Sequence, residues 1–396
     1  MDAGVGHKDR VVVILSRIPF PLDKGDKLRA WHQLKTLCAE FEVLLICLNE
    51  NGTPTPLQEK GLNELNCQIE ILPLSKIRRG VQLFRALFNG DPFQVAYFYQ
   101  KPAVKRIRQL IEGFLPKHIY CQLVRTAKYA EAFGVVPSTL DYMDALSAGM
   151  ARRYVESKRL YKFLFKTEAD RLHRYEHQCF SMFNNKTIIT KNDLNLIDHP
   201  DHNEIKIIAN GVDFDFFNTP REPLPHTVLF TGNMSYPPNI KAAVFLVREV
   251  LPHILQHYPT VKLILAGANP ASEVKCLASK NVEVTGWVND MRTHYARAHV
   301  FAAPMFIGTG LQNKLLEAMA MKVPVITTSL ANDALKAKHR EEVVIADTAK
   351  EMGEAIVELF ENQDFTNKVA EAGQSFVINK YSWSANNKML VDLLRH

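Results

Sequence analysis

The chain has 396 residues, of which 47% are hydrophobic and 23% are charged, and its formal net charge is +6. This composition excludes a disordered or low-complexity chain, and the length predicts two domains with a core each. Six scattered cysteines without a Cys-x-x-Cys pair exclude a disulfide framework and a zinc finger, and no apolar run is long enough to predict a membrane span. We therefore expect a cytoplasmic protein.

The first half of the chain alternates short apolar runs with segments of helical spacing. Such β-branched runs predict parallel strands that are buried on both faces. The predicted strands are 11–15, 42–48, 69–74, 118–121, 138–142 and 187–190. Their alternation with helices predicts an α/β domain of the Rossmann-like β/α/β type over residues 1–205.

The second half repeats this scheme after a proline-rich piece, 220–226, that suits a linker. Here the predicted strands are 227–231, 261–266, 282–285, 299–304, 323–328 and 343–346. We assign a second Rossmann-like domain to residues 206–375. In sheets of this kind ligands bind at the carboxyl ends of the strands, so two such edges facing each other predict a central cleft.

One segment joins the predicted strand 299–304 to a helix through a glycine-containing loop, 308–312. The free N–H groups at the start of that helix predict a site for a diphosphate. Lys314 in the first turn would add a positive charge, and Glu317, one turn later on the same face, could accept hydrogen bonds from ribose hydroxyls. Glycine turns before helices also occur for backbone reasons alone, so a purely structural role stays open.

Residues 301–326 resemble the donor-site signature of family 4 retaining glycosyltransferases of the surface-polysaccharide type, which have the GT-B fold. Glu317 matches the second glutamate of that signature, and Lys314 matches a subgroup of the family. Further matches follow in the family's order along nearly the whole chain, at Pro19–Asp26, Asn210–Asp213, Gly286–Asp290 and Tyr381–Trp383. The resemblance implies that residues 376–396 form a terminal segment whose helix crosses back to the first domain.

The chain also departs from the family pattern. Thr309 stands where the first glutamate is expected, so it cannot supply a carboxylate, and Lys322 replaces a glycine. Asn233 occupies the position of an arginine that neutralises the departing diphosphate, and a proline lies near the position of the accompanying lysine. The available substitutes are Lys314, Lys241 and the helix start at Asn239.

The resemblance implies transfer of a sugar, with retention, from a nucleoside-diphosphate sugar to a hydroxyl of a glycan or lipid-linked acceptor in cell-surface polysaccharide synthesis. No acidic Asp-x-Asp metal site is evident, so we expect neither a metal nor another cofactor. The alternatives are a sugar-nucleotide epimerase, which Thr309 disfavours, and an inactive binding partner of the same fold. We expect no nucleic-acid partner, because basic and aromatic residues are not interleaved as in single-strand-binding proteins.

The donor site is expected to draw on both halves, with Gly25 beneath the phosphates unless it only forms a turn. The predicted donor-binding residues are Gly25, Gly232, Asn233, Asn239, Lys241, Trp287, Val288, Thr309, Gly310, Leu311, Gln312, Lys314 and Glu317.

Candidate acceptor residues lie at the carboxyl edge of the first predicted sheet. Gln122 and Arg125 follow one strand and Asp141 and Asp144 end another, whereas His118 lies at the opposite end of its strand. Either aspartate could instead cap the following helix. The predicted acceptor-binding residues are Asp26, Gln122, Arg125, Asp141 and Asp144, and the predicted catalytic residues are Lys314, Arg125 and Asp141.

Basic residues concentrate between positions 74 and 110, where Asp91 is the only acid, and again between 152 and 174. A helix over 76–88 would place an apolar stripe beside cationic side chains. Such a helix could bind an anionic membrane surface, as expected for a peripheral protein at the inner face of the plasma membrane. The alternative is that the stripe packs on the sheet of the first domain while the charges stay in water.

Overall fold

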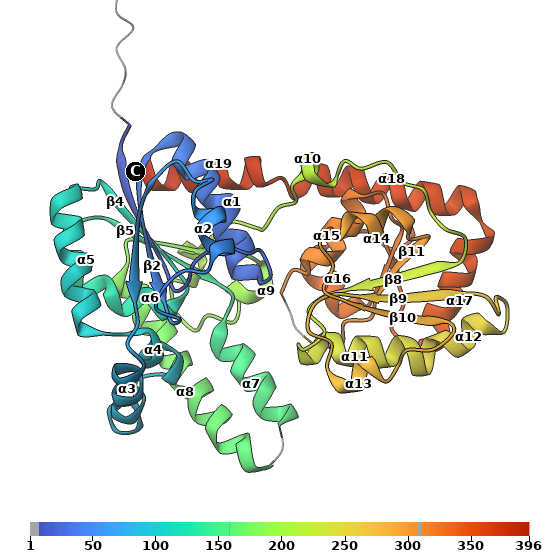
Figure 1. The fold of residues 1–396 in the computed structure, drawn as a ribbon, viewed down its shortest axis with the longest axis horizontal. Helices are drawn as coiled ribbons and strands as arrows, with labels where there is room; N and C mark the ends of the chain where they lie inside the picture. Colours follow the sequence, from blue (N-terminus) through green and yellow to red (C-terminus); the bar gives the residue numbers. More distant parts are fainter. Residues whose placement is uncertain (1–7, 158, 308–309, 396) are drawn as a thin grey trace, which may run out of the picture. The chain divides into compact units, whose positions relative to one another are not determined.

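The computed structural model describes residues 8–157, 159–307 and 310–395, and the chain divides into two compact units (Figure 1). Unit 1 comprises Met1–Ala209 and Ser384–His396, and unit 2 comprises Asn210–Trp383. Both breaks lie a few residues beyond the boundaries predicted at 205 and 375. The reason is a pairing within unit 2, in which the Val212 N–H donates to the Tyr381 carbonyl at 2.8 Å. The cleft expected between the units stays a prediction.

Unit 1 is built on a seven-stranded parallel sheet with the order β3-β2-β1-β4-β5-β6-β7. The strands are β1 (Arg10–Leu15), β2 (Glu42–Asn49), β3 (Gln68–Pro73), β4 (His118–Gln122), β5 (Ser138–Met143), β6 (Asn185–Ile188) and β7 (Lys206–Ile207). Six of them confirm the predicted strands to within a residue or two. The short β7 was not predicted, because two residues carry no periodic pattern.

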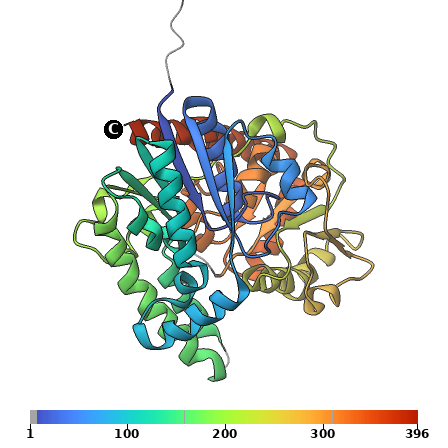
Figure 2. The same ribbon diagram turned by 60° about the vertical axis from the view of Figure 1, so that its left-hand side comes forward.

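The helices of unit 1 are α1 (Gly25–Glu40), α2 (Pro56–Leu62), α3 (Lys76–Asn89), α4 (Phe93–Phe98), α5 (Lys101–Phe114), α6 (Val124–Ala127), α7 (Leu146–Glu156), α8 (Arg159–Met182), α9 (Lys191–Leu194) and α19 (Trp383–Arg395). They cover both faces of the sheet, as Figure 2 shows for α5 in front of the strands. Alternate residues of β1 serve the two sides: Val12 and Ile14 pack with α4, α5 and α8, whereas Val11 and Val13 pack with α1, α2 and α19. Burial on both faces explains the continuous apolar runs.

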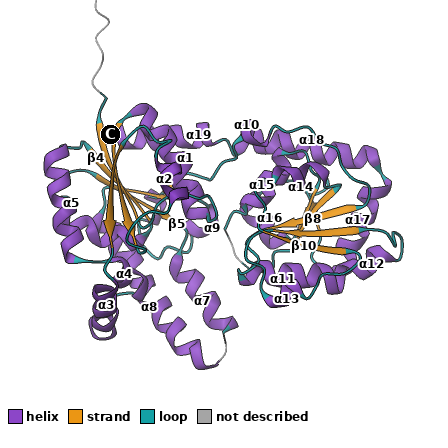
Figure 3. Ribbon diagram, viewed as in Figure 1, coloured by secondary structure: helices purple, strands orange, loops and turns teal. Residues whose placement is uncertain are grey.

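Unit 2 contains a six-stranded parallel sheet with the order β10-β9-β8-β11-β12-β13 (Figure 3). Its strands are β8 (Thr227–Thr231), β9 (Lys262–Ala266), β10 (Val282–Gly286), β11 (Val300–Ala303), β12 (Val325–Thr327) and β13 (Val344–Ile345), all of which were predicted. Its helices are α10 (Phe214–Phe217), α11 (Pro237–Phe245), α12 (Leu251–Leu255), α13 (Ser272–Lys275), α14 (Arg292–Arg297), α15 (Asn313–Ala320), α16 (Ser329–Leu335), α17 (Ala349–Glu361) and α18 (Gln363–Lys380).

The strand order reverses once in each sheet, between β1 and β4 in unit 1 and between β8 and β11 in unit 2. In doubly wound sheets the loops that leave the strands at such a point splay apart and bind ligands. The segments that follow these four strands are therefore the strongest candidates for a ligand-binding site.

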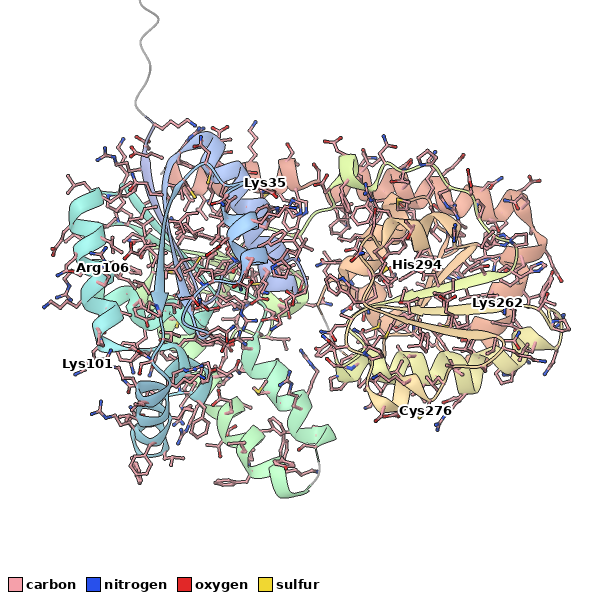
Figure 4. The ribbon with its side chains drawn as sticks, viewed as in Figure 1. Lys35, Lys101, Arg106, Lys262, Cys276 and His294 are labelled. Atoms are coloured by element: carbon pink, nitrogen blue, oxygen red, sulfur yellow. The ribbon has the colours of Figure 1, made fainter. Side chains whose placement is uncertain are left out.

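All six cysteines are free thiols, as expected for a chain without a disulfide framework. Four are buried and Cys67 is half-buried, whereas Cys276 is exposed just after α13 (Figure 4). Within the described residues, no helix has both the length and the apolar character needed to cross a bilayer.

Candidate functional site

The second sheet presents α15 at its reversal point, reached from β11 through the loop that precedes Gln312. Gln312 is the N-cap of the helix, and its side-chain amide donates to the Gly310 carbonyl at 3.0 Å. Gly310, Leu311 and Gln312 are half-buried. Thr309, which was predicted to contact the donor, lies outside the described residues.

Lys314 occupies the first turn of α15 and is half-buried. Its Nζ donates to Asn239 Oδ1 at 2.5 Å and lies 4.7 Å from the centre of the Phe230 ring. Burial lowers the pKa of the Lys314 amine to about 7, and only Glu317 opposes that shift. The protein thus compensates the positive charge of Lys314 only weakly. An anionic ligand would supply the missing negative charge.

Glu317 lies one turn later and is also half-buried. Its Oε2 accepts a hydrogen bond of 2.9 Å from the Tyr295 hydroxyl, which also lies 2.9 Å from Thr231 Oγ1. Burial raises the pKa of the Glu317 carboxyl, whereas the Tyr295 hydrogen bond and Lys314 lower it. Sequence reasoning missed Tyr295, because its place in α14 gives no sign that it reaches the start of another helix.

Two glycines end the neighbouring strands β8 and β9 and keep this edge open. Gly232 has a φ of +153°, and a Cβ there would lie 2.6 Å from Asn239 Nδ2 and 3.2 Å from Lys314 Nζ. Gly267 has a φ of +148°, and its Cβ would lie 1.8 Å from the Gly232 carbonyl oxygen. Both positions therefore exclude a side chain, and the structure brings Gly232, Asn239 and Lys314 together as one group.

The other donor-site residues predicted after β8 are Asn233, Asn239 and Lys241, and they differ in burial and in hydrogen bonding. The side chain of Asn233 hydrogen-bonds within its own turn, where its Oδ1 accepts from the N–H of Ser235 at 3.0 Å. A neutral amide held in this way does not replace the positive charge of the arginine expected at this position. Asn239 is buried in the first turn of α11, which starts at Pro237 and not at Asn239 as expected. Lys241 is exposed on the same helix.

The turn after β10 carries Trp287 and Val288. Gly286 has a φ of +71°, which suits the tight turn. The Trp287 side chain is 63% exposed and donates from Nε1 to Asn289 Oδ1 at 3.2 Å, while Val288 is half-buried. An exposed indole of this kind is available to stack on a planar ligand.

In unit 1, Gln122 is the last residue of β4 and Arg125 lies three residues later, at the reversal point of the first sheet. The Gln122 amide donates to the Asp26 carbonyl at 3.2 Å. Arg125 donates from Nε and Nη2 to Gln94 Oε1, at 3.1 and 2.6 Å. Within the described part of the chain no carboxylate lies within ion-pair distance of Arg125, and burial together with Arg17 lowers its pKa.

Arg125 borders a cavity of about 360 Å³. Arg17, which follows β1, also lines it and lies 3.2 Å from Asp26 Oδ2. The buried Nε2 of Gln94 has no hydrogen-bond partner among the described residues. The cavity is lined by Arg17, Glu50, Leu83, Phe93, Gln94, Tyr97, Phe98 and Arg125. Sequence reasoning missed Arg17, although its place directly after a central strand was a usable signal.

Asp141 has a different position from the one expected of an acceptor-binding or catalytic residue. Its side chain is fully buried and pairs with the buried Arg29, whose Nε lies 2.6 Å from Asp141 Oδ2. The hydroxyls of Tyr120 and Thr187 donate to the same carboxylate at 2.8 and 2.9 Å. The structure therefore corrects the prediction: the Asp141 carboxylate is enclosed by protein donors and holds Arg29 in the core.

Asp144, three residues later, is exposed. Desolvation by the surrounding protein, together with the negative charge of Asp193, raises the pKa of its carboxyl to about 6. The positive charges of Arg125 and Arg152 act in the opposite direction and lower that pKa. It stays a candidate for contact with acceptor hydroxyls.

Gly25 is exposed at the first position of α1, and a Cβ there would meet no atom within 4 Å. Packing therefore does not require glycine at this position. His118 lies at the start of β4, away from Gln122, with Nε2 2.8 Å from Thr139 Oγ1, and burial lowers its pKa to about 4.

Among the described residues, no group of three or more His, Cys, Asp or Glu side chains could hold a metal ion. The expected independence from metals stays a prediction.

Comparisons with known proteins agree with this architecture. The structure of HepE from Anabaena in complex with UDP-glucose aligns with a TM-score of 0.69 and 14% sequence identity, over 97% of this chain and 99% of that chain. Sucrose-phosphate synthase from Thermosynechococcus elongatus aligns with the same TM-score of 0.69 and 13% identity, over 98% of each chain. The chain thus has the α/β fold of two Rossmann-like units known as GT-B.

Sequence relatives match a shorter stretch. An uncharacterised 44.6 kDa protein in the cps region of Klebsiella pneumoniae is 26% identical over 163 residues, 39% of this chain and 42% of the relative. A phosphatidyl-myo-inositol mannosyltransferase of Mycobacterium tuberculosis is 27% identical over 197 residues, 45% of this chain and 50% of the relative. The matched stretch thus spans about half the length of these curated relatives or less.

The family model described as "Glycosyl transferases group 1" matches residues 225–362, which include β8, α11 and α15. These are the elements that bring Asn239, Lys314 and Glu317 together. Unit 2 of this chain is therefore built around a group 1 glycosyl transferase domain.

Proposed function

We propose that the protein is a retaining glycosyltransferase that moves a sugar from a nucleoside-diphosphate sugar to a hydroxyl group. The observation that carries the proposal is the half-buried Lys314 amine, held by Asn239 beside Glu317 at the start of a helix. A cation that the protein has desolvated gains most from a ligand that brings negative charge. A diphosphate at a helix N-terminus is such a ligand.

In this proposal the donor is bound by groups of the second sheet. Lys314, the Asn239 amide and the first N–H groups of α15 hold the diphosphate, and Gly232 leaves room for it. Within the described residues, Glu317 hydrogen-bonds to the protein through Oε2 alone, so Oε1 can accept from ribose hydroxyls while Oε2 stays bonded to Tyr295. Trp287 and Val288 border the place of the base.

Catalysis then depends on stabilising the charge that develops on the departing diphosphate. Preorganised cations and N–H groups are worth most in a site that excludes water. Lys314 is therefore the main catalytic group, and Lys241 on α11 supplies a second positive charge for the same anion. Retention and independence from a metal ion belong to this proposal.

The acceptor side is supported by the cavity beside Arg125. Its lining combines apolar and aromatic side chains with two guanidinium groups and the Gln94 amide, whose Nε2 has no hydrogen-bond partner among the described residues. Such a lining fits an acceptor that carries an anionic group next to an apolar part. Arg125 and Arg17 take the anion, and Gln122, Asp26 and Asp144 lie nearby for hydroxyl groups.

The biological setting is proposed from the same chemistry and from the relatives. One relative is named for a cps region and another for a phosphatidyl-myo-inositol acceptor. A role in the synthesis of cell-surface polysaccharide or glycoconjugate on a lipid-linked acceptor agrees with both names. We place the protein in the cytoplasm, at the inner face of the plasma membrane.

The test is a screen of the purified protein against nucleotide sugars, with release of free nucleoside diphosphate as the readout. Slow release without acceptor, lost in Lys314→Ala, is the expected result. Conversion of one nucleotide sugar into another without release of diphosphate would instead identify an epimerase. Binding without any turnover would identify an inactive partner, and no binding of any nucleoside diphosphate would refute the donor site.

A further inference from the structure

The apolar stripe of α3 faces solvent. Ile77, Val81, Phe84 and Phe88 follow the spacing i, i+4, i+7 and i+11, which places them on one side of a helix. Their side chains are 81%, 45%, 64% and 77% exposed, respectively, and the Phe84 and Phe88 rings contact each other edge to face at 5.4 Å. The alternative that this stripe packs on the sheet is therefore wrong for unit 1.

Helix α5 shows the ordinary arrangement for comparison. It carries as many basic residues, but its apolar residues Val104, Ile107 and Ile111 are buried in the core of unit 1. Figure 4 shows Lys101 and Arg106 on the outer side of that helix. The outward apolar face of α3 is thus not a general property of basic helices in this unit.

Basic side chains flank the exposed stripe. Lys76, Arg78 and Arg85 are exposed and form no ion pair with any described residue. Arg79 differs, because it turns inward to hydrogen-bond with the Tyr97 hydroxyl and the Glu50 carbonyl. Helix α3 contains no acidic residue, so the face carries apolar and positive groups only.

A second element has the same character. The hairpin of α7 and α8 exposes Val155, Tyr161, Phe163 and Leu164 near its tip, with Phe163 81% exposed. Exposed basic residues accompany them at Arg153 and Lys166. Both Figure 1 and Figure 2 show α3 and this hairpin projecting at the same end of unit 1.

The two projections are tied together by Arg171 of α8. Its Nη1 donates to the Ala86 carbonyl at 2.5 Å and to the Asp91 carbonyl at 3.0 Å, which fixes the C-terminal end of α3 against α8. Glu168, one turn earlier, accepts from the N–H groups of Phe93 and Gln94 at 2.7 and 2.9 Å. The C-terminal end of α3 and the segment that follows it are therefore held against α8, the helix that also carries Tyr161, Phe163 and Leu164.

We propose that α3 and the exposed apolar side chains described on the α7–α8 hairpin together dock unit 1 on an anionic lipid bilayer, with these aromatic and aliphatic side chains in the headgroup region. An amphipathic helix with flanking arginines and lysines fits an interface that is apolar below and negatively charged above. A protein partner would have to match two separate apolar projections and their charges at once. This docking surface does not depend on the proposed enzymatic activity.

The surface also adjoins the cavity in unit 1. Leu83, on the side of α3 that faces the protein, lines that cavity together with Arg17 and Arg125. A bilayer bound to the outer side of α3 would therefore bring lipid headgroups to the same helix whose inner side borders the proposed acceptor site.

The test uses the full chain and sedimentation with vesicles of phosphatidylcholine and phosphatidylglycerol, compared with phosphatidylcholine alone. We expect binding to the mixed vesicles at low salt and loss of binding as salt rises. Arg78→Glu with Arg85→Glu should weaken it about 25-fold or more, since each basic residue near the surface contributes about fivefold. Phe84→Ser with Phe88→Ser should weaken it without changing its salt dependence.

The matched control is Lys35→Glu with Lys60→Glu, which makes the same change in net charge on α1 and α2. Figure 4 places Lys35 at the end of unit 1 away from α3. Equal weakening by both charge-reversed pairs would overturn the proposal, because binding would then follow net charge alone. Dispersal of a stable dimer by Phe84→Ser with Phe88→Ser, without any effect on vesicles, would identify a second copy as the occupant and also overturn it.

A separate readout tests the two-part nature of the surface. Phe88→Trp and Phe163→Trp each place an indole in one projection, and fluorescence quenching by brominated lipid reports its depth. Both variants should be quenched on anionic vesicles. Quenching in Phe88→Trp alone would show that α3 binds without the hairpin and would refute the two-part surface.

Discussion

The pKa of Lys314 makes donor binding depend on pH in a calculable way. Burial lowers the pKa of this amine to about 7 in the free protein. A bound diphosphate would restore the pKa toward the ordinary lysine value of about 10.4. Above pH 7 the amine must therefore take up a proton when a nucleoside diphosphate binds.

The magnitude follows from linkage. At pH 8 about nine tenths of the free protein has a neutral amine, so binding should take up about 0.9 proton, and affinity should fall about tenfold for each further pH unit. Isothermal titration calorimetry at pH 8, in two buffers with different ionisation enthalpies, measures this uptake directly.

Turnover of Lys314→Ala should fall about 10²-fold, because the departing diphosphate loses one preorganised cation.

Lys314→Arg serves as the control, because a guanidinium stays charged throughout this pH range and should abolish the proton uptake. Uptake close to zero in the unmodified protein would refute the reasoning. So would the same uptake in Lys314→Ala, since the proton would then go to another group.

Four further predictions concern stability and cofactors. Because the folded pKa of Lys314 is below the unfolded one, the free energy of unfolding should rise between about pH 7 and pH 10 by up to about 1.4 kcal/mol per unit, and thermal unfolding of Lys314→Met should lack that rise. Asp141→Asn should cost about 3–5 kcal/mol in urea denaturation, since Arg29 would stay buried without a countercharge; a loss below 1 kcal/mol would contradict this. Gly25→Ala should leave the melting temperature unchanged but weaken nucleotide-sugar binding, whereas Gly267→Ala, with its Cβ 1.8 Å from a carbonyl oxygen, should lower the melting temperature. Activity should survive treatment with a chelator, and strict dependence on added magnesium or manganese would refute the metal-free mechanism.

The parallel sheets could be predicted closely because burial on both faces leaves a direct record in the sequence. Strands such as β1 and β8 are short runs of apolar residues between helical segments, and the prediction found their bounds to within one residue. The loop before α15 could be found because glycine, lysine and glutamate stand at helix-specific spacing. The contact of Lys314 with Asn239 could not, because the two residues lie 75 positions apart and meet only when β8 and β11 pair.

The wrong assignment of Asp141 and the open alternative for α3 have the same physical origin. A carboxylate at the end of a strand either faces a ligand or pairs with a buried cation. The partner of Asp141 is Arg29, which lies 112 positions away in the sequence. The periodicity of α3 predicted an apolar stripe but not its direction, which depends on how Arg79 and Arg171 hold the helix. In both cases the pattern is local, whereas the outcome depends on contacts between distant segments.

The terminal helix α19 has a consequence for how the protein is made. Leu390, Val391 and Leu394 pack in the same core as Val11 and Val13 of β1, and Asn387 hydrogen-bonds to His32 and Thr36 of α1. A ribosome therefore synthesises all of unit 2 before it releases the residues that close the first core. Until then the part of this core that α19 covers is exposed in the nascent chain, so unit 1 is completed only by its last helix, and chaperones have a defined surface to protect in the meantime.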